Sequence, residues 1–415
     1  MQLLPSDTTP THKIINAAVI VAALGYFVDI YDLVLFSVTR VQSLKDIGVP
    51  QEKLGDIGGE LLGYWQMLGM LLGGLLWGIL GDKKGRLSVL FGSIILYSIA
   101  NIANGFVQTV EQYKILRLVA GIGLAGELGA GITLVSEVLS KEKRGYGTMI
   151  VATIGLLGAV AAFGITTLFN WRNAYFVGGG LGLLLLLLRI SVYESGMFKT
   201  ALQSNVSRGN FVLLLRNKKL LFRYIQCILI GLPTWYVVGI LVTLSPEFGH
   251  AFGMDTPPAT AAQAVMWCYI GLALGDLLSG TISQVWKSRR KTMALFHLIS
   301  LSTVLYYLFS GNISLQAIYF KCFLLGIGVG YWAVFVTIAA EQFGTNIRAT
   351  AATTVPNFVR GALALIFFIF TTLKTTAGII NSALLVGVVC ILTALVAVYF
   401  LPETYNKELD YFEEG

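Results

Sequence analysis

The chain has 415 residues, of which 56% are hydrophobic and 12% charged, and its formal net charge is +7. Ordinary soluble domains carry roughly 25% charged residues, so the composition excludes a soluble fold of this size, which would lack a polar surface. The basic residues lie in short segments between apolar runs, which argues against a nucleic-acid partner. The 46 glycines are typical of helices packed closely in lipid. The sequence therefore predicts an all-α membrane protein.

Twelve apolar runs are long enough to cross the hydrocarbon core, which takes roughly 20 helical residues. In chain order they are 14–40, 59–81, 87–108, 111–139, 145–168, 172–192, 222–250, 261–285, 292–311, 315–342, 347–374 and 378–401. The longest polar interruption separates the sixth run from the seventh. We therefore expect an N-terminal six-helix bundle over 1–192, a cytoplasmic central linker over 193–220, and a C-terminal six-helix bundle with a short cytoplasmic tail over 221–415.

The basic residues also predict the orientation of these spans. An excess of Lys and Arg in short loops is typical of the cytoplasmic side. If both termini are cytoplasmic, the loops in which Lys and Arg gather all lie on that side. The clusters are Lys83, Lys84 and Arg86; Lys141, Lys143 and Arg144; and Lys287, Arg289, Arg290 and Lys291. We expect a multi-pass protein with both termini inside, of the kind found in a bacterial inner membrane.

The two halves repeat each other in sequence. The second predicted span contains Gly69-x-x-x-Gly73-x-Leu-Leu-x-Gly78, and the eighth contains the same pattern 202 residues later, from Gly271 to Gly280. The fourth and tenth spans each carry a Gly-Ile-Gly triplet, followed by a Glu and an Arg seven residues apart. These pairs are Glu137 with Arg144 and Glu341 with Arg348. Two parallel six-helix repeats are a known layout of secondary transporters.

Three motifs carry a resemblance to a known family. Gly78-Ile-Leu-Gly81-Asp82-Lys-Lys-Gly-Arg86 resembles the G-x-x-x-D-x-x-G-R/K signature of the major facilitator superfamily. Pro402-Glu-Thr404 resembles the ending of its sugar-porter and organic-ion branches. The stretch from Arg117 to Glu127 resembles the fourth span of its organic-ion and metabolite:proton symporters. The resemblance implies a charge network that shuts the cytoplasmic side and is made by Asp82, Arg86, Glu137, Arg144, Glu341 and Arg348.

Departures from the family patterns narrow the choice among the branches of the superfamily. The fifth span has no Gly-Pro pair of the kind found in drug exporters, and the seventh has a single Gln226 where sugar porters are expected to have two glutamines. We therefore favour a metabolite symporter. An exporter or facilitator of the same fold remains open, as does a phosphate or sugar carrier; a non-transporting receptor on the same fold is a further alternative.

Ionisable residues inside predicted spans point to function, because a charge at the bilayer centre costs at least about 2.5–3.5 kcal/mol. Asp29 and Asp32 lie three residues apart and so share one face of a helix, which we expect to line a central cavity. Glu127 lies midway along the fourth span. We expect proton coupling at these three carboxylates, with substrate contact as a second option for Glu127. The structural alternatives are that one Asp caps a break in the helix or holds a water, and that Glu127 makes a hydrogen bond to a neighbouring helix.

Arg360 is the main predicted substrate contact, because a guanidinium suits a carboxylate or phosphate. Its repeat position in the first half is Leu156, so the charge is not part of the shared scaffold. An internal salt bridge to Asp29, Asp32 or Glu127 is the alternative. Asp276 is expected to line the cavity or to bond to the eleventh span. Arg117 and Lys321 are expected to be structural and to reach water at the helix ends. The further predicted substrate contacts are Tyr26, Trp235, Tyr236, Tyr331 and Asn357.

No feature of the sequence indicates an enzyme, a metal or a cofactor. The cysteines form no C-x-x-C pair, the three histidines are not grouped with a nucleophile, and no Gly-rich ATP-binding loop occurs. The sequence thus predicts a proton-coupled symporter of a small organic anion that works as a monomer, with protons, substrate and the lipid bilayer as its partners.

Overall fold

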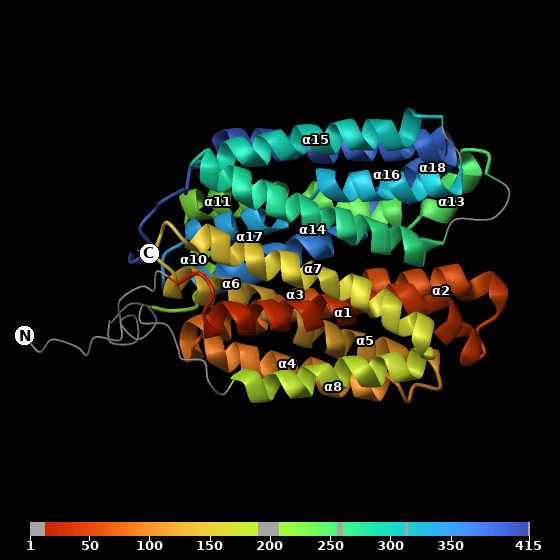
Figure 1. Ribbon diagram of the computed structural model, residues 1–415, viewed down its shortest axis with the longest axis horizontal. Coiled ribbons are helices and arrows are strands. Elements are labelled where there is room, and N and C mark those ends of the chain that lie inside the picture. The colour runs from red at the N-terminus through yellow and green to blue at the C-terminus, as the bar shows by residue number, and fades with distance from the viewer. Residues whose placement is uncertain (1–12, 190–206, 255–259, 312–313, 414–415) are drawn as a thin grey trace, which may run out of the picture.

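The computed structural model describes residues 13–189, 207–254, 260–311 and 314–413. These residues form long helices that run roughly parallel to one another and are joined by turns (Figure 1). Most of the predicted linker, residues 193–206, lies outside the described ranges. The remainder of it contains the short helix α10 (Phe211–Arg216).

The first half of the chain forms one side of the bundle in Figure 1. Its helices are α1 (Ala17–Asp46), α2 (Leu54–Glu60), α3 (Met67–Lys84), α4 (Arg86–Asn104), α5 (Val110–Leu124), α6 (Glu127–Val138), α7 (Arg144–Leu168) and α8 (Trp171–Arg189). Helices α2 and α3 join into one apolar stretch, as do α5 and α6. We call residues 17–189 the N-half.

The second half forms the other side. Its helices are α11 (Lys218–Leu229), α12 (Leu232–Tyr236), α13 (Ser245–Ala251), α14 (Ala261–Val285), α15 (Arg289–Phe309), α16 (Leu315–Gly328), α17 (Trp332–Glu341) and α18 (Arg348–Phe400). We call residues 211–400 the C-half. Within the described ranges, eleven helical stretches are long and apolar enough to cross a membrane.

Helix α18 accounts for the difference between eleven stretches and twelve predicted spans. Its 53 residues would extend about 80 Å at 1.5 Å per residue, well over twice the ~30 Å hydrocarbon core. Gly378 interrupts it with φ 77° and ψ 167°, a backbone conformation that favours glycine. The two segments on either side match the eleventh and twelfth predicted spans, so the all-α, twelve-span fold is confirmed.

Glycines of the sequence repeat occupy equivalent contacts in the two halves. A Cβ atom at Gly69 would overlap the carbonyl oxygen of Leu118 on α5, and one at Gly271 would overlap that of Phe323 on α16. The second span thus packs on the fourth in the same way as the eighth packs on the tenth. Such close backbone approach is what small residues provide in lipid, where no hydrophobic force drives helices together.

Two breaks in these packed helices position the site. The fourth span is interrupted at Ala125–Gly126, between α5 and α6, and the tenth is interrupted at Val329–Tyr331, between α16 and α17. Backbone groups freed at a break must bond elsewhere, because lipid offers no partner. A side chain of α18 in the other half meets the break in the fourth span, and a side chain of α14 in the same half meets the break in the tenth.

Candidate functional site: a central charge pair behind a closed gate

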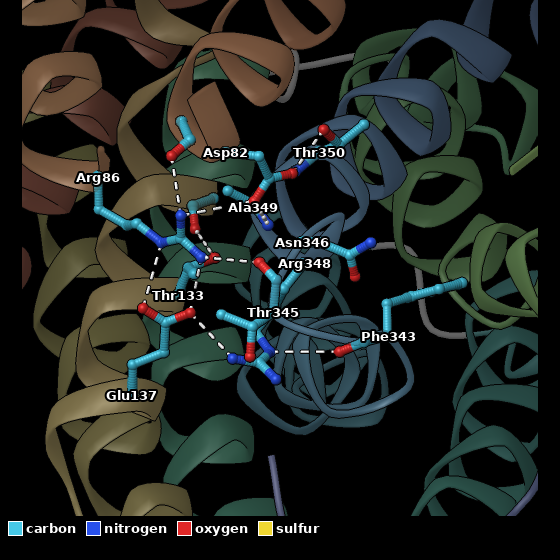
Figure 2. A network of polar contacts seen from close by, with 12 residues as sticks. Asp82, Arg86, Thr133, Glu137, Phe343, Thr345, Asn346, Arg348, Ala349 and Thr350 are labelled. Carbon is cyan, nitrogen blue, oxygen red and sulfur yellow. Dashed lines mark hydrogen bonds and ion pairs between the residues drawn. The ribbon is translucent and has the colours of Figure 1, made fainter. Parts of the chain in front are cut away.

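Charged residues join the two halves at one end of the bundle. We call this end the C-tail face, because residues 401–413 lie on it (Figure 1). Glu137 of the N-half lies between two arginines: its Oε1 is 2.7 Å from Arg86 of the same half and 2.9 Å from Arg348 of the C-half (Figure 2). Arg86 also donates to the backbone carbonyl of Thr345 at 3.2 Å. All four residues are buried, so the contacts are shielded from water.

Asp82 makes a second connection between the halves. Its carboxylate accepts hydrogen bonds from the backbone N–H groups of Ala349 and Thr350, at 3.0 and 2.8 Å, and from the Thr350 hydroxyl at 2.7 Å (Figure 2). These donors lie at the first turn of α18, where backbone N–H groups lack intrahelical partners and the helix dipole favours a negative charge. Asp82 therefore caps a helix of the opposite half.

The remaining predicted gating residues lie at the same end, but their ion pairs do not follow the Glu–Arg pairs of the sequence pattern. Glu341 pairs with Arg289 at 3.3 Å within the C-half. Arg348, which follows Glu341 by seven residues, pairs instead with Glu137 of the N-half. Arg144 donates to the carbonyl of Lys407 at 2.9 Å. Sequence reasoning did not single out Arg289 for this network, although it lies one residue from the repeat position of Arg86.

The C-terminal tail covers this network and spans both halves. Lys141 of the N-half forms an ion pair with Glu408, and Arg348 of the C-half donates to the carbonyl of Leu409. The backbone N–H of Thr345 donates to the carbonyl of Tyr411 at 2.8 Å. Residues 401–413 thus bind both sides of the closed face, a role that no motif in the tail indicates.

A second ion pair joins the halves deep in the bundle. Nη2 of Arg360 on α18 lies 4.0 Å from Oδ2 of Asp29 on α1. The guanidinium lies between Trp235 and Trp332, with 5.8 Å from its central carbon to each ring centroid. Tyr26 lines the same space. Arg360 and Asp29 are at most 1% exposed, so this pair is held away from water by aromatic residues.

The central pair has unused hydrogen-bonding capacity. Within the described part of the chain, neither oxygen of Asp29 has a hydrogen-bond partner, nor has Nε of Arg360. The indole N–H groups of Trp235 and Trp332 are also without an acceptor. Buried polar groups nearly always have partners, and each exception calls for an explanation. Here the unpaired donors are Nε of the cation itself and the indole N–H groups of the two tryptophans beside it, an arrangement that suits a bound anion.

The space at this site is too small for an organic ligand in the present conformation. A cavity of about 20 Å³ touches Arg360, Tyr26 and Tyr269, and a second of about 40 Å³ lies alongside it, bordered by Trp235 and Leu363. A water molecule needs about 10–15 Å³ by this measure. The site thus has room for water but not for an organic ligand in this conformation.

Asp32 does not share this site, contrary to the prediction that both aspartates line one cavity. Its carboxylate lies against Gly178 of α8, where a Cβ atom would overlap Oδ1, and it interacts electrostatically with Arg117 of α5. Arg117 donates to Asn101 at 3.2 Å and lies over the rings of Phe36 and Tyr175. Asp32 is therefore enclosed within the N-half, while Asp29 faces the C-half.

Arg117 and Lys321 also differ from their predicted environment. Arg117 is fully buried and Lys321 is 2% exposed, with Nζ 5.1 Å from the ring centroid of Phe252. Neither side chain is therefore open to the surroundings in this conformation, contrary to the expectation that both reach water at the helix ends.

Three other predicted residues serve the helix breaks next to the central pair. Asn357 donates to the carbonyl of Ala125, at 2.9 Å, and so satisfies the break in the fourth span. Asp276 accepts from the backbone N–H of Ala333 at 3.0 Å, at the start of α17, and not from the eleventh span, which was one of the two roles expected of it. Glu127 begins α6 and interacts electrostatically with Asp29.

Two predicted aromatic residues point away from the site. The Tyr236 hydroxyl donates to the carbonyl of Ala383 at 2.6 Å, inside the C-half. The Tyr331 ring packs beside His297, with 4.8 Å between centroids. The residue that sequence reasoning missed is Tyr269 of α14, which lines both central cavities. It lies seven residues before Asp276, on the same face of α14.

Comparisons with known proteins agree with this architecture. The model of the Major Facilitator Superfamily matches residues 22–368. A probable 4-methylmuconolactone transporter of Cupriavidus pinatubonensis is 28% identical over 94% of this chain and 91% of its own. A 3-(3-hydroxy-phenyl)propionate transporter of Escherichia coli is 28% identical over 69% of this chain and 70% of its own. The solved structure of the proton:xylose symporter XylE shares the fold, with a TM-score of 0.74 over 95% of this chain and 97% of that one, at 16% identity.

Proposed function

Because this chain belongs to the Major Facilitator Superfamily, we propose that it is a proton-coupled symporter of a small organic anion whose body is planar and apolar. It is a transporter and not an enzyme. The observation that carries the proposal is the central pair: Arg360 lies between two tryptophans, opposite a carboxylate of the other half, with donors left unused. The 3-(3-hydroxy-phenyl)propionate transporter supports it, since that name denotes a carboxylate joined to an aromatic ring by a two-carbon chain.

In the proposed mechanism, substrate and Asp29 compete for Arg360. A substrate carboxylate binds the guanidinium with two parallel hydrogen bonds, which a carboxylate 4.0 Å away does not make. The substrate ring stacks against Trp235 and Trp332. Asp29, displaced from its partner, would be left charged in a site closed to water, which is costly. A proton on Asp29 removes that cost.

This coupling determines in which states of the site the two halves can close. With substrate on Arg360 and a proton on Asp29, the site contains no unpaired charge, so the halves close over it at the lowest cost. With substrate alone, an unpaired carboxylate opposes closure. With neither, Asp29 returns to Arg360 and the empty carrier closes, which allows the cycle to be completed. Alternating access is then a rocking of the N-half against the C-half around a fixed site.

Asp32 is the second possible proton carrier. It lies within the N-half beside Arg117, so a proton on it would act on the packing of the N-half and not directly on the substrate. Substitutions of the two aspartates are therefore expected to have different effects. Asp29→Asn should change substrate affinity and coupling together, whereas Asp32→Asn should change coupling alone.

We further propose that the C-tail face is cytoplasmic. The basic clusters predicted to be inside lie at this end, and both the Asp82 and Glu137 contacts close it. The present conformation would then be shut towards the cytoplasm, and substrate would enter the central site from the other side.

The test is transport by purified protein in proteoliposomes under an imposed pH gradient, with 3-phenylpropionate and benzoate as probes. We expect gradient-driven accumulation, its loss in Arg360→Gln, and loss of accumulation but retention of counterflow in Asp29→Asn. Benzamide, xylose and inorganic phosphate serve as a neutral, a sugar and an inorganic probe. Equal transport of benzamide and benzoate would refute an anion carrier, and normal accumulation by Asp29→Asn and Asp32→Asn alike would refute proton coupling at either aspartate.

A further inference from the structure

A basic groove outside the transport path lies on the C-tail face, where α14 ends, α15 begins and α18 ends. It encloses about 620 Å³ and is open to the surroundings. Three cations line it, Lys287, Arg290 and Lys291, together with Trp286 and Tyr399. None of these residues takes part in the gate or the central pair. The groove therefore calls for its own explanation.

The charge of the groove is positive. Its single carboxylate, Glu403, is already used: it accepts from the Ser288 hydroxyl at 2.5 Å and from the backbone N–H groups of Arg289 and Arg290, at 2.9 and 3.2 Å. Arg290 in turn donates through Nε to the carbonyl of Val398 at 3.2 Å, which fixes its guanidinium at the end of α18.

The two lysines remain available to a ligand. Lys287 and Lys291 are both exposed, and within the described part of the chain no ion pair engages either of them. The groove thus presents two accessible ammonium groups beside an anchored guanidinium, against one carboxylate that is already occupied.

The position of the groove places it at the boundary between hydrocarbon and headgroups. Val285 and Phe400 at the ends of α14 and α18 are 69% and 60% exposed, as expected of side chains that face lipid. Trp286 and Tyr399 lie beside them and are also exposed. Exposed Trp and Tyr at the ends of spanning helices are typical of the membrane interface. The apolar side of the groove is made by Leu395 and Val398 of α18.

Lys287 adds an independent observation. Its φ is +51°, a left-handed conformation that costs a non-glycine residue free energy. The repeat position in the N-half, 202 residues earlier, is Gly85, whose φ is also positive, at 102°. The same turn thus has glycine in one half and a strained lysine in the other. Backbone strain of this kind tends to be kept where the side chain has a function.

We propose that this groove binds the phosphate headgroup of an anionic phospholipid, with Lys287, Lys291 and Arg290 around the phosphate and one acyl chain along Leu395 and Val398. A membrane lipid fits better than a free anion, because the cations stand next to an apolar wall at the interface level. Basic pockets between spanning helices are known to select anionic headgroups. The bound lipid would tie the end of α18 to the start of α15.

The experiment measures the thermal stability of the full-length protein in detergent as phosphatidylglycerol is titrated in. Phosphatidylcholine and inorganic phosphate are the parallel probes. The variants are Lys287→Gly and Lys291→Gln, with Lys219→Gln as the matched control, since Lys219 is an exposed cation that does not line the groove. Lys287→Gly places glycine at a positive φ and so should fold at least as well as the wild type.

We expect phosphatidylglycerol, and neither other probe, to raise the melting temperature, with an apparent affinity about fivefold weaker for each lysine removed. Lys219→Gln should match the wild type. Equal effects of phosphatidylglycerol on the wild type and on the double variant Lys287→Gly/Lys291→Gln would overturn the proposal. A shift produced by inorganic phosphate alone would also overturn it, in favour of a free-anion site.

Discussion

Replacing Asp82 by Asn should release the closed C-tail face. In the closed state the carboxylate accepts three hydrogen bonds from Ala349 and Thr350 of the opposite half, and when the halves part it is solvated instead. Hydrogen bonds to a charged group contribute about 1.5–3 kcal/mol each. Asparagine keeps one acceptor oxygen but turns an NH₂ group towards a backbone N–H. We therefore expect closure to weaken by about 2–4 kcal/mol, which is roughly a 30- to 700-fold shift towards the open state.

The assay is the distribution of distances between spin labels on the two halves. Lys84→Cys and Lys218→Cys place labels at exposed positions of the N-half and C-half, and all four native cysteines are buried. The Asp82→Asn variant should show a second, longer distance or a complete shift to it. Lys83→Gln, which removes an exposed neighbouring charge, is the control. An unchanged distribution in Asp82→Asn would refute the view that this carboxylate holds the halves together.

Three further outcomes are expected. Gly158→Ala should lower the free energy of unfolding by about 1–3 kcal/mol, because its Cβ atom would overlap the carbonyl oxygen of Phe27. Gly164→Ala, which has open space around it, should leave the free energy of unfolding unchanged, and thermal unfolding of both variants measures the difference. Burial raises the pKa of Glu403, but hydrogen bonds from Ser288 and backbone N–H groups outweigh it and hold this pKa below its usual value. The stability advantage of the wild type over Glu403→Gln should therefore be present at pH 7 and vanish as the pH falls through that lowered pKa; an advantage that persists or grows in acid would contradict this. Trp235→Leu should weaken binding of benzoate more than that of acetate, measured by competition, and equal losses would argue against ring stacking.

The glycine pattern predicted much of the fold. Gly69 and Gly271 head the same motif, which indicated that the sequence repeats, and the two glycines pack in the same way against α5 and α16. Span boundaries agreed within a few residues for most helices; the 261–285 span matches α14 residue for residue. Long apolar runs in lipid have few alternatives to a helix, since every backbone group must bond internally.

The site was less predictable, because it depends on which helices meet. Asp29 and Asp32 do lie on neighbouring turns of one face, but α1 stands between α18 on one side and the interior of the N-half on the other, so the two carboxylates meet Arg360 and Arg117 separately. Tyr236 follows Trp235 directly, so it lies about 100° further around the helix and its hydroxyl meets the carbonyl of Ala383 inside the C-half instead. Pairing across the gate was likewise invisible, since Arg348 bonds to Glu137, more than two hundred residues away.

The most direct test of the central claim is equilibrium binding of radiolabelled benzoate to purified protein at neutral pH. If substrate and Asp29 compete for Arg360, Asp29→Asn should bind benzoate at least about tenfold more tightly than the wild type, a gain of ~1.4 kcal/mol. The charge–charge attraction available at the 4.0 Å separation is about 4 kcal/mol for an effective dielectric constant of about 20. Arg360→Gln should abolish binding, and adding Asp29→Asn to it should not restore it. Unchanged affinity in Asp29→Asn, or benzoate binding that survives Arg360→Gln, would contradict the account.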